Sequence, residues 1–231
     1  MILPLQSRLF PVIGIDNLVE IDGNSRFQEE ERARCFDEPW YWLVNYVYSI
    51  RKDEFVVDSK PEVSRFPPLA HLRLVFHRCF TETKLVIDKS RQMVMTWLLM
   101  AYYLYRCQFG EFEEIIVQTK KEIDADLNLI KKAEFMANSQ RTWLRPVVKG
   151  AYCKLVFPGT HSSMRGLAGG TGAGDQIRSA NPSRGFIDEG GFMDDFEECR
   201  TAFLACCTDL KIVSTANGGQ FSAFIHDRIV A

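Results

Sequence analysis

After residue 83 the sequence alternates short apolar runs with longer amphipathic stretches, and this alternation limits the possible folds more than any other feature. Five runs have the length and character of buried strands: KLVID (84–88), EIIVQT (114–119), CKLVF (153–157), GFID (185–188) and LKIVST (210–215). Helical patterns lie between them at 96–108, 120–138 and 195–207. This order predicts an α/β fold with a mostly parallel sheet flanked by helices on both faces.

The N-terminal part lacks this alternation. It begins as an irregular arm, and helical spacing of apolar residues then predicts helices over 38–52 and 69–80. Prolines punctuate 56–68, which favours a loop. We therefore expect an N-terminal arm with a lid-like helical segment at 1–68 and a core domain at 69–231, within the size of one α/β domain plus a small subdomain.

Composition excludes several classes of protein. The 28 basic and 30 acidic residues leave a formal net charge of -2, so any contact with nucleic acid must be local. Seven cysteines without framework spacing indicate free, mostly buried thiols in a reducing compartment. The N-terminus has no basic lead-in with a long apolar stretch, and the apolar run at 97–105 is too short for a membrane span. We expect a soluble protein that is not secreted and has no membrane partner.

The stretch GFIDEGGF places two acids at the end of a predicted strand. Side chains alternate along a strand, so Asp188 and Glu189 should point to opposite faces at the carboxyl edge of the sheet. In a phosphate-handling ATPase, this arrangement lets one carboxylate act through Mg²⁺ while the other orients an attacking water. Taken alone, the pair is also typical of a solvated turn.

Two further strand ends carry polar groups suited to phosphate. KSRQMVMT (89–96) lies between a strand and a helix, where backbone N–H groups favour anions and the hydroxyl of Thr96 suits Mg²⁺. STANG (214–218) follows the last strand and is placed to sense a γ-phosphate. Three such strand ends in this order favour a nucleotide site at the carboxyl edge of the sheet.

These stretches resemble the ATPase domain of the large subunit of terminases, the DNA-packaging motors of tailed bacteriophages. The resemblance covers roughly residues 38 to 219, and its carrying stretches are PWYWLVNYVY, KSRQMVMTW, IIVQTKKEIDA, DQIRSANPSRGFIDEGGF and STANG. It implies a P-loop NTPase core of the ASCE, RecA-like type that uses ATP and Mg²⁺.

The resemblance also implies residue roles. The phosphate loop would comprise Lys89, Ser90, Arg91, Gln92, Met93, Val94, Met95 and Thr96. Asp188 matches the Walker B aspartate that holds Mg²⁺ together with Thr96, and Glu189 matches the catalytic glutamate. Arg178 matches an arginine finger that reaches the ATP of a neighbouring subunit.

Two further sets of residues match family motifs. Ser214, Thr215 and Asn217 match the coupling motif that links hydrolysis to movement. Arg65 and Phe66 lie where such proteins often hold adenine. The resemblance implies double-stranded DNA, the portal protein and the small terminase subunit as partners. It also implies a homo-oligomeric ring that works in the host cytoplasm at the procapsid portal.

The chain departs from the family pattern in its phosphate loop. Val94 and Met95 stand where a glycine and a lysine are usual, so the cation that phosphoryl transfer needs must come from elsewhere. Lys89 is our first choice and Arg91 our second. The alternative is a loop that binds nucleotide poorly or not at all.

The C-terminal part departs as well. Family members usually continue into an RNase H-like nuclease domain, but no second acidic cluster follows STANG before Ala231, and we expect no nuclease activity from this chain. Two other functions stay open: a helicase-like nucleic-acid ATPase, and a degenerate ATPase fold that only docks on a portal or small subunit. The glycine-rich stretch 159–176 predicts a mobile loop, which either is a connection without chemistry or faces DNA or a neighbouring subunit with Arg165 as a second candidate finger. Lysines 120, 121, 131 and 132 could contact phosphates, but the acids between them favour a solvated helix face.

Overall fold

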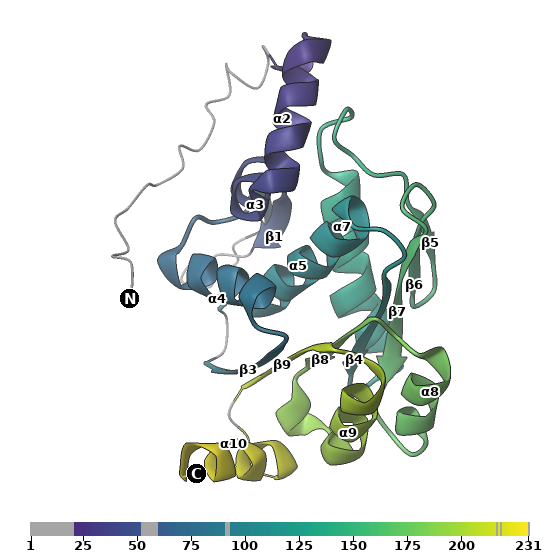
Figure 1. The fold of residues 1–231 in the computed structure, drawn as a ribbon. Helices are drawn as coiled ribbons and strands as arrows, with labels where there is room; N and C mark the ends of the chain where they lie inside the picture. Colours follow the sequence, from purple (N-terminus) through teal and green to yellow (C-terminus); the bar gives the residue numbers. More distant parts are fainter. Residues whose placement is uncertain (1–20, 52–59, 91–92, 216, 218, 231) are drawn as a thin grey trace.

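The computed structural model describes residues 21–51, 60–90, 93–215, 217 and 219–230 (Figure 1). The helices are α2 (Ser25–Asp37), α3 (Pro39–Tyr46), α4 (Ala70–Thr81), α5 (Met95–Phe109), α6 (Glu122–Asp124), the π-helical η1 (Ala125–Ile130), α7 (Lys131–Asn138), α8 (Ala173–Ala180), the 3₁₀ turn η2 (Gly190–Phe192), α9 (Phe196–Cys206) and α10 (Gln220–Val230). The strands are β1 (Tyr48–Arg51), β2 (Glu62–Arg65), β3 (Lys84–Lys89), β4 (Glu114–Thr119), β5 (Lys149–Ala151), β6 (Lys154–Phe157), β7 (Ser162–Ala168), β8 (Arg184–Asp188) and β9 (Asp209–Thr215).

The main sheet has seven strands in the order β3-β9-β8-β4-β7-β6-β5. The first five strands in this order, β3, β9, β8, β4 and β7, are parallel to one another. The last two, β6 and β5, pair antiparallel at one edge of the sheet. The predicted mostly parallel sheet is therefore confirmed. Its strand order places β9 between β3 and β8, so the carboxyl ends of these three neighbours lie together.

Helices cover both faces of the sheet (Figure 1). On one face lie α4, α5 and α7, and on the other lie α8, α9 and α10. The sequence of α5, MTWLLMAYYLYRCQF, is apolar nearly all around, as expected of a helix that is enclosed on every side. Separate hydrophobic clusters on the two faces include Leu99 with Val117, and Phe196 with Phe203.

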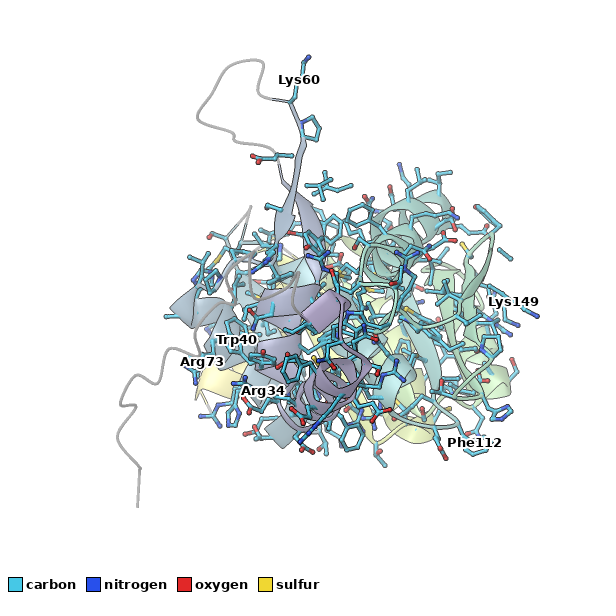
Figure 2. The ribbon with its side chains drawn as sticks, turned by 90° about the horizontal axis from the view of Figure 1, so that it is seen from above. Arg34, Trp40, Lys60, Arg73, Phe112 and Lys149 are labelled. Carbon is cyan, nitrogen blue, oxygen red and sulfur yellow. The ribbon has the colours of Figure 1, made fainter. Side chains whose placement is uncertain are left out.

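The N-terminal elements differ from the sequence prediction in two places. The predicted helix over 38–52 ends at Tyr46, and the chain then enters β1, which pairs antiparallel with β2 inside the stretch expected to be a loop. The two-stranded ribbon extends from the body of the molecule, with Lys60 at its outer end (Figure 2). Trp42 of α3 belongs to the same hydrophobic cluster as the buried residues of α5. The domain boundary at residue 68 stays a prediction.

The glycine-rich stretch also differs from its prediction as a mobile loop. It contains β7, whose backbone pairs with β4 on one side and β6 on the other. Gly166 of this strand lies against η1, where an added Cβ would come within 3.2 Å of the Ala125 side chain. This glycine therefore permits close packing of a helix on the sheet, and its presence does not indicate mobility.

The free, mostly buried thiols predicted from the cysteine pattern are confirmed: all seven cysteines are unpaired, and Cys206 alone is not fully buried. Among the described residues, the helices are too short or too polar to cross a lipid bilayer.

Candidate functional site

The carboxyl ends of β3, β9 and β8 bring together the residues predicted from three separate motifs. Lys89 ends β3, Thr215 ends β9 and Asp188 ends β8, with Glu189 directly after it. Thr96 joins them from the first turn of α5, which follows β3. The site thus depends on the insertion of β9 between β3 and β8, a feature of strand order that brings distant parts of the sequence together.

The two acids face different partners. Asp188 is 5% exposed and accepts a hydrogen bond from the Thr96 hydroxyl, with Oγ1 lying 3.1 Å from Oδ2 and 3.3 Å from Oδ1. Glu189 accepts a hydrogen bond of 2.8 Å from the hydroxyl of Thr215. Its backbone is left-handed, with φ 55° and ψ 41°, a conformation that non-glycine residues seldom adopt and that is enriched at functional sites.

Lys89 forms an ion pair with Glu189. Its Nζ lies 3.1 Å from Oε1 of Glu189, and its side chain is only 8% exposed. Burial alone would raise the pKa of Glu189, but the hydrogen bonds from Thr215 and Lys89 outweigh it and lower the pKa. Glu189 is therefore kept ionised, as a group that orients or activates water must be.

Asp188 lies in a different electrostatic environment. Burial and the negative charge of Glu189 raise its pKa to about 6, while Lys132, Thr96 and Lys89 act in the opposite direction. A buried carboxylate with incomplete compensation, next to a hydroxyl, has the hard oxygen donors that Mg²⁺ prefers, and Mg²⁺ sites often use one or two carboxylates plus substrate phosphates. These residues fit the metal. Among the described residues, no cluster of three His, Cys, Asp or Glu side chains offers a metal cage built from protein alone.

The raised pKa of Asp188 predicts a stability gain on its neutralisation. The folded state binds this proton more tightly than the unfolded chain does, so the contribution of Asp188 is favourable below pH 4 and is lost as the pH rises through about 6. In Mg²⁺-free buffer at pH 8, Asp188→Asn should raise the free energy of unfolding by about 2–3 kcal/mol, and at pH 5 by roughly half as much. Denaturant unfolding of the variant and of wild type at pH 8 and at pH 5 measures the two differences in free energy of unfolding.

The matched control for this prediction is Asp194→Asn. Asp194 has a side chain that is 94% exposed and pairs with Lys120 at the surface, so its replacement should give no such gain. If Asp188→Asn changes the free energy of unfolding by the same amount at pH 5 and at pH 8, the stability gain does not come from removing the charge of Asp188.

The residues of the predicted phosphate loop lie between the end of β3 and the start of α5. The first main-chain bond of this helix runs from Leu98 N–H to Val94 O, which leaves the preceding N–H groups outside the helical bonding pattern, and no side chain caps them. Such a helix start favours anions. Ser90 is exposed and Met93 packs against the core, whereas Arg91 and Gln92 lie outside the described residues.

The residues that replace the usual glycine and lysine are both buried to some degree. Met95 is 3% exposed, so its side chain belongs to the core and only its backbone is available to a phosphate. Val94 takes the left-handed conformation, with φ 56° and ψ 15°, where a glycine would be unstrained. The backbone thus keeps a glycine-like geometry although the side chain is β-branched.

This geometry predicts an inverted order of stability at position 94. Val94→Gly should be more stable than Val94→Ala by about 1 kcal/mol, because a left-handed conformation strains any residue with a Cβ. At the exposed position His77 in α4, the order should be the ordinary one, with alanine ahead of glycine by about 1 kcal/mol. Thermal and denaturant unfolding of the four variants compare the two positions. If the alanine variant is more stable than the glycine variant at both positions, the backbone at Val94 is not strained.

The predicted coupling residues contact the segment that follows the glutamate. The N–H of Gly191 donates to the hydroxyl of Ser214 at 2.9 Å, and the side-chain amide of Asn217 donates to the carbonyl of Gly191 at 2.9 Å. Gly191 is tightly enclosed, since an added Cβ would lie 2.8 Å from Ser214 Oγ. Together with the Thr215 contact to Glu189, these bonds tie the end of β9 to the acid pair and to the turn that follows it.

Three predicted residues lie apart from this cluster. Arg178 is in the last turn of α8, which runs from the carboxyl end of β7 back to the amino end of β8, and it pairs with Asp175 at 2.8 Å. Within one subunit it is therefore not part of the site. Phe66 is 1% exposed in the core, so its ring is not free to stack on adenine, and the expectation of an adenine contact remains only for half-buried Arg65.

One nearby residue, Lys132, has a different environment from the one that the sequence favours. Lys132 was expected on a solvated helix face, but it is half-buried, with Nζ 5.4 Å from the centre of the Trp97 ring. Trp97 directly follows Thr96 in α5. Nothing in the local sequence separates Lys132 from Lys131, because only the packing of α7 on α5 places one inward and the other outward.

Several solved structures share this fold. The large terminase of bacteriophage HK97 matches with a TM-score of 0.59 and 15% sequence identity, over 84% of this chain and 41% of that one. The ATPase domain of the Thermus phage P74-26 large terminase matches with 0.51 and 15%, over 67% of each chain. The large terminase of a thermophilic bacteriophage, in complex with ADP, matches with 0.55 and 15%, over 70% of this chain and 43% of that one.

These matches establish the fold of the chain, which is that of the ATPase domain of large terminases. The chain spans less than half the length of the HK97 protein and of the ADP-bound terminase. No family model matches the sequence, and no curated protein matches it significantly.

Proposed function

We propose that this chain is the ATP-hydrolysing motor domain of a viral DNA-packaging terminase. The observation that carries the proposal is the meeting of three contacts at one sheet edge: Thr96 with Asp188, Lys89 with Glu189, and Thr215 with Glu189. This combination supplies a metal-binding pair, a second carboxylate held ionised, and a cation beside the anion-favouring start of α5. The fold shared with large terminases supports the same conclusion.

Each residue has a distinct task in this proposal. Asp188 and Thr96 would hold Mg²⁺, which would neutralise charge on the phosphates. Glu189 orients and activates the water that attacks the γ-phosphate, and Lys89 interacts with the phosphates from the end of β3. In the ligand-free arrangement Lys89 is paired with Glu189, so an incoming phosphate competes with the carboxylate for this cation. Nucleotide binding would thereby release one of the two partners of the glutamate.

Movement would start at the end of β9. Thr215 contacts Glu189 directly, while Ser214 and Asn217 contact Gly191, two residues further along. If hydrolysis displaces the segment 189–191, the three side chains that contact it would transmit the displacement to the end of β9. We propose that this is how hydrolysis is linked to the translocation of double-stranded DNA.

Assembly would complete the site. Arg178 lies away from the acids of its own subunit and is exposed beside Asp175, a position open to a neighbour. We propose that it acts on the nucleotide of an adjacent subunit in a homo-oligomeric ring, which works in the host cytoplasm with the portal protein and the small terminase subunit. An arginine supplied in this way can accelerate phosphoryl transfer by orders of magnitude, so the isolated chain is expected to be slow.

The test is ATP binding and phosphate release by the purified protein, alone and with double-stranded DNA, followed by the assembled ring on portal. ATP binding with DNA-stimulated turnover and translocation of duplex DNA would support a motor. Unwinding of the duplex would instead support the helicase-like alternative. Docking to portal without any ATP binding, even in the assembly, would reject the motor and support the degenerate docking module.

A further inference from the structure

Lys132 lies in an environment that does not satisfy its charge. Its helix α7 packs on α5, and its ammonium group stands over the ring of Trp97 in the first turn of α5. This turn also carries Thr96 and the N–H groups outside the helical bonding pattern, so the cation lies close to the turn of α5 where phosphate would bind. The Trp97 ring is itself fixed by an edge-on contact with Phe135 of α7.

The neighbouring lysines are satisfied and Lys132 is not. Lys131 pairs with Glu134 at 2.8 Å, and Lys120 pairs with Asp194 at 3.4 Å, both at the surface. In the part of the chain that the structure describes, Lys132 has no ion-pair partner. A half-buried cation without a carboxylate partner is costly, since burial removes hydration that only an anion restores.

Two charges of the site act on Lys132. Burial lowers its pKa, the carboxylate of Asp188 works against that shift, and the positive charge of Lys89 adds to it. The charges of Lys132 and Lys89 therefore both act on Asp188, although the two lysines come from different elements, one from α7 and the other from the end of β3. A polyphosphate placed between them would relieve the repulsion of the two cations.

We infer that Lys132 is a phosphate-binding residue of the nucleotide site and that, with Lys89, it replaces the lysine whose position Met95 occupies. This inference rests on the proposed function, because it assigns a ligand to the same site. The chemistry it requires is a charge-assisted contact with the β- or γ-phosphate oxygens of a nucleoside triphosphate. The cation–π contact with Trp97 holds the ammonium in place until the phosphate arrives.

The experiment compares the ATP affinity of Lys132→Met with that of Lys131→Met. Both substitutions remove one positive charge from adjacent positions, so any general effect of net charge is shared. We expect Lys132→Met to weaken ATP binding by about 10- to 100-fold and Lys131→Met to change it less than about twofold. Lys132→Arg should recover part of the affinity, and calorimetric titration of wild type and the three variants with ATP gives the dissociation constants.

The outcomes separate this inference from the proposed function. Equal ATP affinity in wild type and Lys132→Met overturns the role of Lys132 and leaves the ATPase proposal standing. If wild type does not bind ATP in the assembly, the proposed function and this inference fail together. Thermal unfolding should show Lys132→Met at least as stable as wild type, because the lost group is a half-buried unpaired cation. Lys132→Gln provides a second uncharged side chain in case the methionine variant does not fold.

Discussion

Replacing Glu189 by glutamine is expected to reduce ATP turnover by roughly 100- to 1,000-fold while changing ATP affinity only a few-fold. Glutamine is nearly isosteric and still accepts a hydrogen bond from Thr215, so the loop after β8 should keep its shape. It does not carry the negative charge that withdraws a proton from water. Because the loss concerns the transition state and not ATP binding, phosphate release and equilibrium binding must be measured on the same preparation.

The control for this variant is Glu111→Gln. Glu111 is an exposed acid in the turn before β4, at the opposite edge of the sheet, so its replacement removes the same charge without touching the site. Its turnover should equal that of wild type, and a loss confined to Glu189→Gln would show that the measured activity does not come from a contaminant. Turnover of Glu189→Gln above about a third of the wild-type rate would exclude Glu189 as the group that activates water.

The sequence was sufficient to predict the class of fold and the three strand ends that form the candidate site. The run LKIVST is readable because β9 is buried along its whole length and most of its residues are apolar. The run KLVID is readable from its consecutive aliphatic residues, although β3 is an edge strand and only partly buried. Strand order is not readable in this way. That β9 lies between β3 and β8 follows from tertiary packing, and this adjacency is what allows Thr215 to reach Glu189.

Glycine content gave a wrong prediction for the stretch 159–176. Small residues were read as mobility, yet β7 needs them because η1 packs closely on Gly166. The same local sequence therefore serves either a loop or a crowded strand, and the difference depends on a helix about forty residues earlier. Phe66 shows the converse error, since a position that resembled an adenine contact in sequence is a buried part of the core.

The cations of the site illustrate the same limit. Lys89 was predictable because it is both the last residue of a strand and the first residue of the predicted phosphate loop, and chain order alone brings it to the sheet edge. Lys132 was not, because its direction depends on which face of α7 meets α5. Residues adjacent to a motif in the chain are therefore predictable from sequence, whereas those that reach the site from a separate helix need the structure.

Lys89→Met is expected to lower ATP turnover by about 100-fold and to weaken ATP binding, because a group that neutralises charge on the phosphates acts in both the bound and the transition state. Arg91→Met is the matched comparison, since it removes the other cation considered for the loop. If Lys89 supplies the required charge, its loss should exceed that of Arg91 in both measurements. Unchanged ATP affinity in Lys89→Met would remove Lys89 from phosphate binding.

The pairing of Lys89 with Glu189 at 3.1 Å offers a second explanation for a loss of turnover and ATP affinity in Lys89→Met, namely that Lys89 only positions the Glu189 carboxylate. A double-mutant cycle on ATP affinity separates the two. If Lys89 binds phosphate, Lys89→Met should still weaken ATP binding in the Glu189→Gln background, where the ion pair no longer exists. If it acts only through Glu189, the effect should vanish there. The ion pair even predicts a larger loss of affinity in the Glu189→Gln background, because Lys89 is then free of the carboxylate that competes with ATP for it.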